Sequence, residues 1–133
     1  MIYIVQNALP ILVATLAGLA VGLLFDRLLR RAGGAARHPL ARLLPTALVA
    51  EGWFCAILAG ALILAPAAKG SAWTMAIGSA VVIWIGFVAP ALIVTARYRA
   101  LPWRTALLDA GHWLAVMLVQ AVVLQSIGLH APR

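Results

Sequence analysis

The stretch "LLDAGHWLAVMLVQAVVLQSIG", residues 107–128, is long and apolar enough to cross a bilayer. Its polar residues include Asp109 and His112 in the first turns and Gln120 further along. Because lipid offers the backbone no hydrogen-bond partners, such a segment spans the membrane as a helix. The composition extends this conclusion to the whole chain: 65% of its 133 residues are hydrophobic, against about 45 to 50% in a soluble domain.

Four segments of the chain meet the requirement for a membrane span, which is about 20 mostly apolar residues. They are residues 2–25, 43–65, 71–96 and 106–128. These runs lack the alternation and the short length of barrel strands, and little sequence remains for a soluble domain. The sequence therefore predicts an all-α membrane protein, in which residues 1–133 form a single four-transmembrane-helix bundle.

The positive charges are concentrated in two of the three connections between these spans. They are Arg27, Arg30, Arg31, Arg37 and Arg42 in the first connection, Arg97, Arg99 and Arg104 in the third, and only Lys69 and Arg133 on the opposite side. The positive-inside rule places both Arg-rich connections in the cytoplasm and both termini outside it. We therefore expect a multi-pass protein of the bacterial inner (cytoplasmic) membrane.

These arginines also account for the net charge of +7. Because they flank apolar spans, the charge predicts contact with anionic lipid headgroups rather than with nucleic acid. Each well-placed arginine contributes about 1 kcal/mol to such binding. The expected headgroup contacts are Arg27, Arg30, Arg31, Arg97, Arg99 and Arg104.

Small residues spaced about one or two turns apart predict where the helices pack, because they allow two backbones to approach closely. They are Gly18 and Gly22 in the first span, Gly52 and Gly60 in the second, and Gly78 and Gly86 in the third. Packing within the bundle is the expected use of these residues. The alternative is a homodimer contact, for which Gly18 and Gly22 are the first candidates.

Two further residues of the third span carry predictions. Trp84 falls on the side of the helix opposite Gly78 and Gly86, so we expect it to meet lipid or another subunit. Pro90 lies inside the span, where proline removes a helix hydrogen bond and is expected to kink the helix.

Ionisable side chains at membrane depth cost at least about 2.5 to 3.5 kcal/mol each, so they usually face the bundle interior. Asp109, His112 and Gln120 share one side of the fourth helix. Counted from the cytoplasmic ends of their helices, Glu51 and His112 lie at similar depths of roughly 12 and 9 Å.

The hypothesis for these residues is that Glu51 and His112 form a buried polar pair, with Asp109 nearer the surface, where it can reach Arg104 or Arg99. Two interpretations of the pair stay open. It is either a structural hydrogen-bonded pair or a site that binds or relays a proton, an ion or a small polar ligand.

Metal, cofactor and catalytic motifs have little support in this sequence. Glu51, Asp109 and His112 offer two oxygen donors and one nitrogen, but no paired histidines or clustered cysteines accompany them. The sequence has no phosphate-binding loop, nucleophile elbow or dinucleotide fingerprint. We therefore expect no metal, no cofactor and no catalytic residues. Cys55 is expected in the core, and His38 and His130 in solvent.

The second half of the chain resembles a known family in the segments "WIGFVAPALIV", residues 84–94, and "LPWRTALLDAGHWL", residues 101–114. Together with the closing apolar helix, they are similar to the DUF1761 family of uncharacterised bacterial four-span membrane proteins. The exit of the first span, "LLFDRLLRR", departs from the family pattern and retains only Phe25. The resemblance implies a four-helix membrane architecture and no particular chemistry.

The function favoured by these features is a structural or accessory component of a membrane assembly, without catalytic activity of its own. Its partners would be the lipid bilayer, further copies of the chain or a larger membrane complex. The alternative is a small dimeric transporter or channel that uses Glu51 and His112. An intramembrane enzyme has the least support, because neither a catalytic triad nor a complete metal shell is visible.

Overall fold

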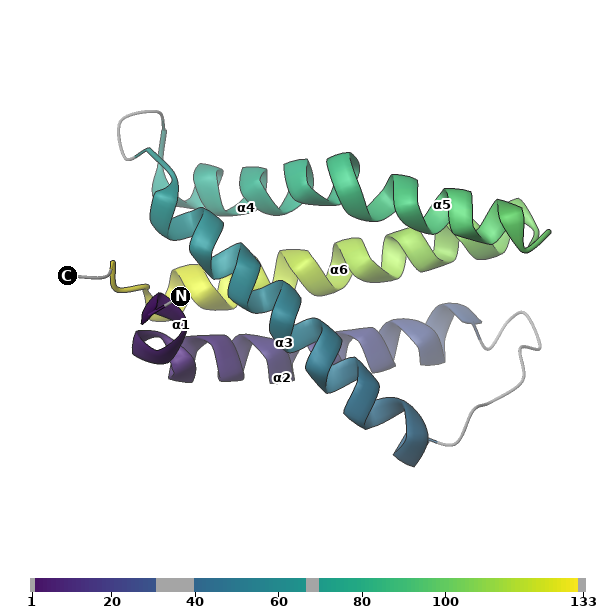
Figure 1. The fold of residues 1–133 in the computed structure, drawn as a ribbon, viewed down its shortest axis with the longest axis horizontal. Coiled ribbons are helices and arrows are strands. Elements are labelled where there is room, and N and C mark those ends of the chain that lie inside the picture. The colour runs from purple at the N-terminus through teal and green to yellow at the C-terminus, as the bar shows by residue number, and fades with distance from the viewer. Residues whose placement is uncertain (1, 31–39, 67–69, 132–133) are drawn as a thin grey trace.

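The computed structural model describes residues 2–30, 40–66 and 70–131. Over these ranges the chain is helical and contains no strand. The elements in Figure 1 are α1 (Ile2–Gln6), α2 (Ala8–Phe25), the π-helical turn η1 (Asp26–Arg30), α3 (Leu40–Leu64), α4 (Ala72–Ile83), the π-helical turn η3 (Trp84–Val88), α5 (Ala89–Tyr98) and α6 (Trp103–Ile127). The predicted all-α class is confirmed.

Four helical stretches are long and apolar enough to cross a membrane: Ala8–Leu29, Ala41–Leu64, Ala72–Tyr98 and Trp103–Ile127. They match the predicted spans to within a few residues except at the start of the first. There the chain forms the short α1, turns at Asn7, and only then begins the spanning helix. In the second span, Pro45 lies inside α3.

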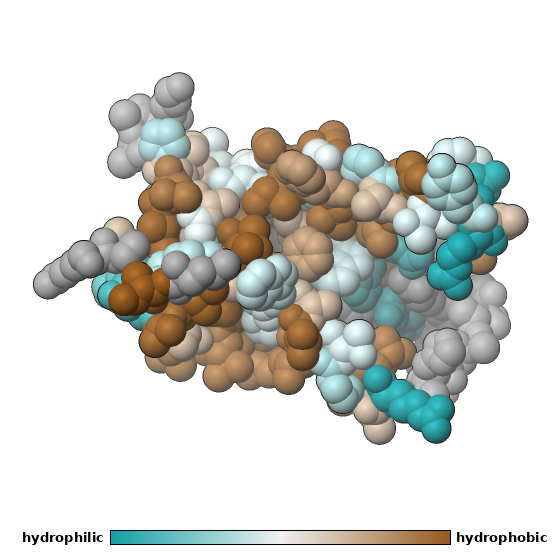
Figure 2. All heavy atoms as spheres, viewed as in Figure 1, coloured by the Kyte–Doolittle hydropathy of each residue, from teal (hydrophilic) through white to brown (hydrophobic). Residues whose placement is uncertain are grey.

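The ends of the bundle differ in character. In Figure 1 the end of η1, the start of α3 and the turn between α5 and α6 lie at one end of the bundle, here called the Arg-rich end, and α1 and the end of α6 lie at the other, the terminal end. Figure 2 shows hydrophilic side chains gathered at the Arg-rich end and apolar side chains along the helices. This arrangement identifies a multi-pass integral membrane protein; which end faces the cytoplasm stays a prediction.

Several of the predicted headgroup residues lie at the Arg-rich end with exposed side chains: Arg27, Arg97, Arg99 and Arg104. Arg97 is partly held by the chain itself, since its Nη1 donates to the carbonyl of Leu101 at 2.6 Å. Its guanidinium carbon also lies 5.0 Å from the ring centroid of Trp103. The backbone of Arg30 is described, whereas Arg31, Arg37, His38 and Lys69 lie outside the described residues.

The central packing contact joins α2 to α6. Gly18 and Gly22 are buried on α2, and an added Cβ at either position would meet α6 side chains at 3.3 Å or less. The Gly-x-x-x-Gly motif is therefore used inside the chain and not at the alternative homodimer contact. Gly52 and Gly60 on α3 face Thr15 and Tyr3. The predicted packing role thus holds for these four glycines.

The prediction is wrong for Gly78 and Gly86, because both are exposed and a Cβ at either would have nothing within 4 Å. The expected orientation of Trp84 is also wrong. Trp84 is half-buried, and its Nε1 donates to the carbonyl of Ala110 on α6 at 2.8 Å. The third span therefore turns its tryptophan toward the bundle and its glycines outward.

The π-helical turn η3 precedes Pro90 and gives a physical reason for part of this arrangement. At this turn the N–H of Ala89 donates to the carbonyl of Trp84, five residues earlier. A wider turn accommodates the proline ring, which would otherwise clash with the preceding turn of an α-helix. Each π turn also takes up an extra residue, so the buried face continues from Ala76 and Ala80 to Val88 and Ala96.

Replacing Trp84 by phenylalanine tests the inward orientation. The change keeps an aromatic ring but removes the N–H that bonds α6, and hydrogen bonds between membrane helices contribute about 0.6 kcal/mol on average, with values up to about 1.7. We expect the free energy of unfolding in mixed micelles to fall by about 1 kcal/mol. The control is Trp73→Phe, an exposed tryptophan of α4, and an equal loss in both variants would contradict the contact.

Candidate intramembrane polar site

Glu51 and Gln120 are buried side by side where α2, α3 and α6 meet. Their exposed fractions are 3% and 0%. The amide Nε2 of Gln120 donates to the backbone carbonyl of Glu51 at 3.3 Å. A Cβ added to Gly18 would lie 2.9 Å from that Nε2 and 3.0 Å from Oε2 of Glu51. The two side chains therefore occupy the space that glycine leaves open on α2.

Hydrogen bonding at this pair is incomplete. Oε2 of Glu51 and Oε1 of Gln120 are both buried and have no hydrogen-bond partner in the structure. The neighbouring Thr15 hydroxyl does not supply one, because it donates to the carbonyl of Ile11 in its own helix at 2.7 Å. Cys55, buried as expected, also points its Sγ at Ile11, at 3.6 Å from the carbonyl oxygen. Two acceptor oxygens are thus left in an apolar interior, where an unpaired polar group is costly.

A second polar pair lies nearer the Arg-rich end. Nδ1 of His112 is 3.2 Å from Oδ1 of Asp26, with side-chain exposures of 15% and 42% respectively. The imidazole packs edge-on against Phe25, with ring centroids 5.6 Å apart. The other ring nitrogen, Nε2, lies against α2, 3.2 Å from where a Cβ of Gly22 would be. The histidine therefore bridges the partly exposed Asp26 and the interior surface of α2.

The structure corrects the hypothesis of a direct Glu51–His112 pair. His112 contacts Asp26 and borders Gly22 of α2. Glu51 lies beside Gln120 and borders Gly18, one helical turn before Gly22 on α2. Val116 separates the two pairs, because its methyl groups lie 3.1 and 3.3 Å from the Cβ positions of Gly18 and Gly22. The predicted similar depths of Glu51 and His112 do not bring them together, because α3 begins at Leu40, earlier than predicted, and crosses its neighbours obliquely (Figure 1).

Asp109 lies one turn before His112 on α6 and is half-buried. Along the helix axis it is about 16 Å from Gln120, at 1.5 Å per residue. Of the four predicted residues, the structure thus joins Glu51 to Gln120 and places His112 and Asp109 closer to the Arg-rich end.

Asp26 lies just outside the predicted first span, residues 2–25, and was not predicted as a site residue. A usable signal was present, because Asp26 follows Gly18 and Gly22 at intervals of four residues and so continues the face of α2 that contacts α6.

Asn7 was also missed and is fully buried at the terminal end. Its Nδ2 donates to the carbonyls of Tyr3 and His130 at 2.8 and 2.9 Å, and its Oδ1 accepts from the N–H of His130 at 2.8 Å. One amide side chain thereby joins the start of the chain to the stretch after α6. The signal in the sequence was weak, because Asn7 is one of several polar residues in the first apolar run and directly follows Gln6.

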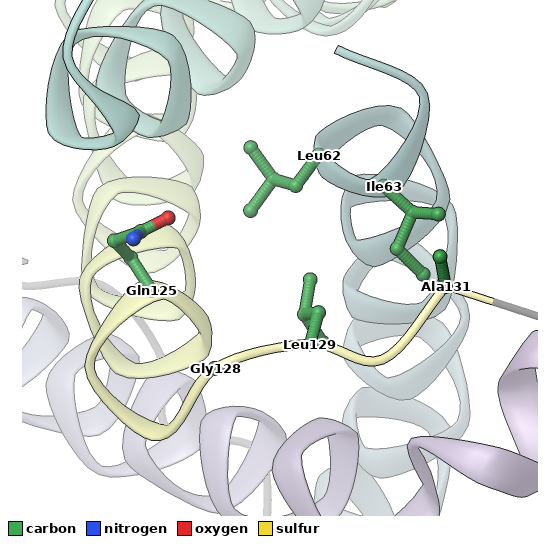
Figure 3. Close-up of a pocket in the computed structure, with 6 residues that line it drawn as sticks. All are labelled: Leu62, Ile63, Gln125, Gly128, Leu129 and Ala131. Carbon is green, nitrogen blue, oxygen red and sulfur yellow. The ribbon is translucent and has the colours of Figure 1, made fainter. Parts of the chain in front are cut away.

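A crevice of about 340 Å³ also lies at the terminal end, between α3 and the stretch that follows α6 (Figure 3). Its lining is Leu62, Ile63, Gln125, Gly128, Leu129 and Ala131. None of these side chains is ionisable, so the crevice offers no acid, base or metal ligand. Within the described part of the chain, no three His, Cys, Asp or Glu residues come close enough to hold a metal ion.

Comparison with family models, with curated proteins and with solved structures finds no match for this chain. Membership of the DUF1761 family therefore stays a prediction. The function has to be argued from the geometry of the polar residues.

Proposed function

We propose that this protein binds a proton within the bilayer at Glu51 and takes part in proton-coupled transport across the membrane. The observation that carries the proposal is the unpartnered Oε2 of a carboxyl group that is 3% exposed. Ionisable residues inside transmembrane bundles commonly mark ion pathways and proton relays. A proton on Oε2 would neutralise the carboxylate and provide a donor.

The surroundings of Glu51 favour a proton over a metal ion. Divalent cations such as calcium and magnesium take about six or more oxygen ligands. Beside Oε2 of Glu51, the buried oxygen left unpartnered is Oε1 of Gln120. A protonated carboxyl needs only one acceptor for its hydrogen, and the Gln120 amide can supply that acceptor after a small rotation.

The position of the pair also supports transport. Gly18 lies near the middle of its span, Ala8–Leu29, and Glu51 near the middle of Ala41–Leu64. Substrate and coupling-ion sites of many transporters lie near the bilayer midplane. Between this pair and the terminal end the buried side chains include the apolar Ile11, Leu58 and Leu124. Release on that side therefore requires a conformational change or a second copy of the chain, as in a homo-oligomeric transporter.

Glu51→Gln tests this function. In proteoliposomes with an imposed pH gradient, we expect proton flux through the native protein and none above the empty-liposome level for Glu51→Gln, because an amide does not take up and release a proton as a carboxylate does. The matched control is Asp109→Asn, the same acid-to-amide change on α6 outside the Glu51–Gln120 pair, which should retain flux. Equal flux through native protein and Glu51→Gln would overturn the proposal.

A second candidate function, an accessory component of a membrane assembly, is favoured by the outward face of the third span. Gly78 and Gly86 are exposed on this face, where no other atoms of the chain lie within 4 Å of an added Cβ. Of the four spans, this one has the smallest fraction of buried residues. Absence of flux in both native protein and Glu51→Gln, with both equally folded, would favour this role. Binding of anionic lipid by the exposed arginines and residence in the inner membrane are part of either proposal.

A further inference from the structure

We infer that His112 relays protons between the Arg-rich end and Glu51, with Asp26 as its outer partner and Val116 as the barrier along the path. The inference rests on the proposed function, because it assigns the route by which Glu51 exchanges its proton with the Arg-rich side of the membrane. It also assigns a side of the membrane, since protons would reach Glu51 from the Arg-rich end.

The two nitrogens of His112 face different surroundings. Nδ1 lies 3.2 Å from Oδ1 of Asp26, whose side chain is 42% exposed and so open to protons from solvent. Nε2 lies against the Gly22 surface of α2, which Val116 also borders. An imidazole can accept a proton at one nitrogen and release one from the other, which suits it to a relay between two compartments.

The glycines of α2 make the path continuous in space. Gly22 borders His112, Gly18 borders Glu51 and Gln120, and one helical turn separates them, about 6 Å along the axis. Side chains at either position would fill the seam between α2 and α6. Val116 contacts both positions and is fully buried, so it blocks direct contact between the two polar pairs.

Glu51 is protonated from the Arg-rich end in two successive proton transfers. A hydronium ion at the Arg-rich end gives a proton to the Asp26–His112 pair at Nδ1. The Nε2–H bond of the imidazolium breaks, and its proton passes through a water molecule that enters beside Val116 to Oε2 of Glu51. The imidazole is left neutral with its proton on Nδ1, and a change to the Nε2–H tautomer, in which Nδ1 loses its proton to Asp26 or water and Nε2 gains one from water, resets it.

Other titratable groups near this route come from each of the packed helices. Asp26 follows α2, Glu51 and Cys55 lie on α3, and Asp109 precedes His112 by one turn on α6. Among the residues that the structure describes, His112 alone has one ring nitrogen against Asp26 and the other against the Gly22 surface of α2. The relay is therefore assigned to His112, which itself accepts and releases the proton that reaches Glu51.

The test is a rapid change from alkaline to acidic pH on the purified protein in nanodiscs, followed by time-resolved infrared spectroscopy. The signal is the carbonyl band of protonated Glu51, assigned by its absence in Glu51→Gln. We expect His112→Asn to slow the rise of this band about 100-fold, typical of the loss of a proton-transfer group, with the final amplitude unchanged. Added imidazole should restore part of the rate.

The matched control is His130→Asn, which changes an exposed histidine at the terminal end and should leave the rate unchanged. Asp26→Asn should also slow the rise, and it tests the same route if His112→Asn fails to fold. Native rates in both folded variants would overturn the relay while leaving proton binding at Glu51 intact. Absence of the band from the native protein would instead overturn the proposed function.

Val116→Ala gives an independent readout with the opposite sign. A smaller side chain opens the barrier between Gly18 and Gly22, so the rise of the Glu51 band should become faster even if the variant is less stable. A merely structural role of Val116 predicts no acceleration, and an unchanged or slower rate would contradict its place on the path.

Discussion

Gly18→Leu is expected to cause the largest loss of stability of any single change considered for this bundle. Even a methyl group at this position would lie 2.9 Å from Nε2 of Gln120, 3.0 Å from Oε2 of Glu51 and 3.1 Å from Val116. Flexible side-chain ends can move for alanine, but leucine requires α2 and α6 to separate. Overpacking a well-packed interior costs about 1 to 3 kcal/mol and sometimes more, so we expect a loss of about 3 kcal/mol or greater.

Unfolding of the purified protein by SDS in mixed micelles measures this loss. The matched control is Gly78→Leu, because a side chain there enters open space. Leucine is a better helix former than glycine by up to about 1 kcal/mol, so the control should be as stable as the native protein or slightly more so. Similar losses of stability in both variants would contradict close packing of α2 against α6 at Gly18.

Asn7→Ala is expected to have the second largest effect on stability. The change removes three hydrogen bonds from a fully buried amide and leaves the N–H and carbonyl of His130 without these partners. An unsatisfied buried polar group costs about 1 to 3 kcal/mol. Since His130 is exposed at its side chain and water can reach part of this region, we expect a total loss within that range, about 1 to 3 kcal/mol.

Hydrogen exchange locates the effect of Asn7→Ala in the structure. The amide of His130 should exchange faster in the variant, because its acceptor is the Asn7 side chain. The amide of Gly128 should not change, since it donates to the carbonyl of Leu124 within α6. The control is Gln6→Ala, an exposed neighbour that should leave both rates and the stability unaltered. Unchanged exchange at His130 in Asn7→Ala would contradict the interaction.

The sequence by itself determined the features that depend on composition and on spacing along one helix. Apolar length fixed the four spans, because the backbone in lipid must satisfy its own hydrogen bonds. The positions of the arginines predicted that the first and third connections share an end. Spacing along α2 identified Gly18 and Gly22 as a close-packing face, and the polar character of Glu51, His112 and Gln120 marked them for the interior.

Only the tertiary structure decided which of these polar side chains meet. Partners across helices depend on crossing angles, tilt and axial position, which arise from the packing of all helices together. The oblique path of α3 brought Glu51 to Gln120, and the continuation of α2 into η1 brought Asp26 to His112. The π-helical turn before Pro90 likewise altered the face of the third span. Helical periodicity assumes a uniform turn, so it could predict neither these pairs nor the inward side of Trp84.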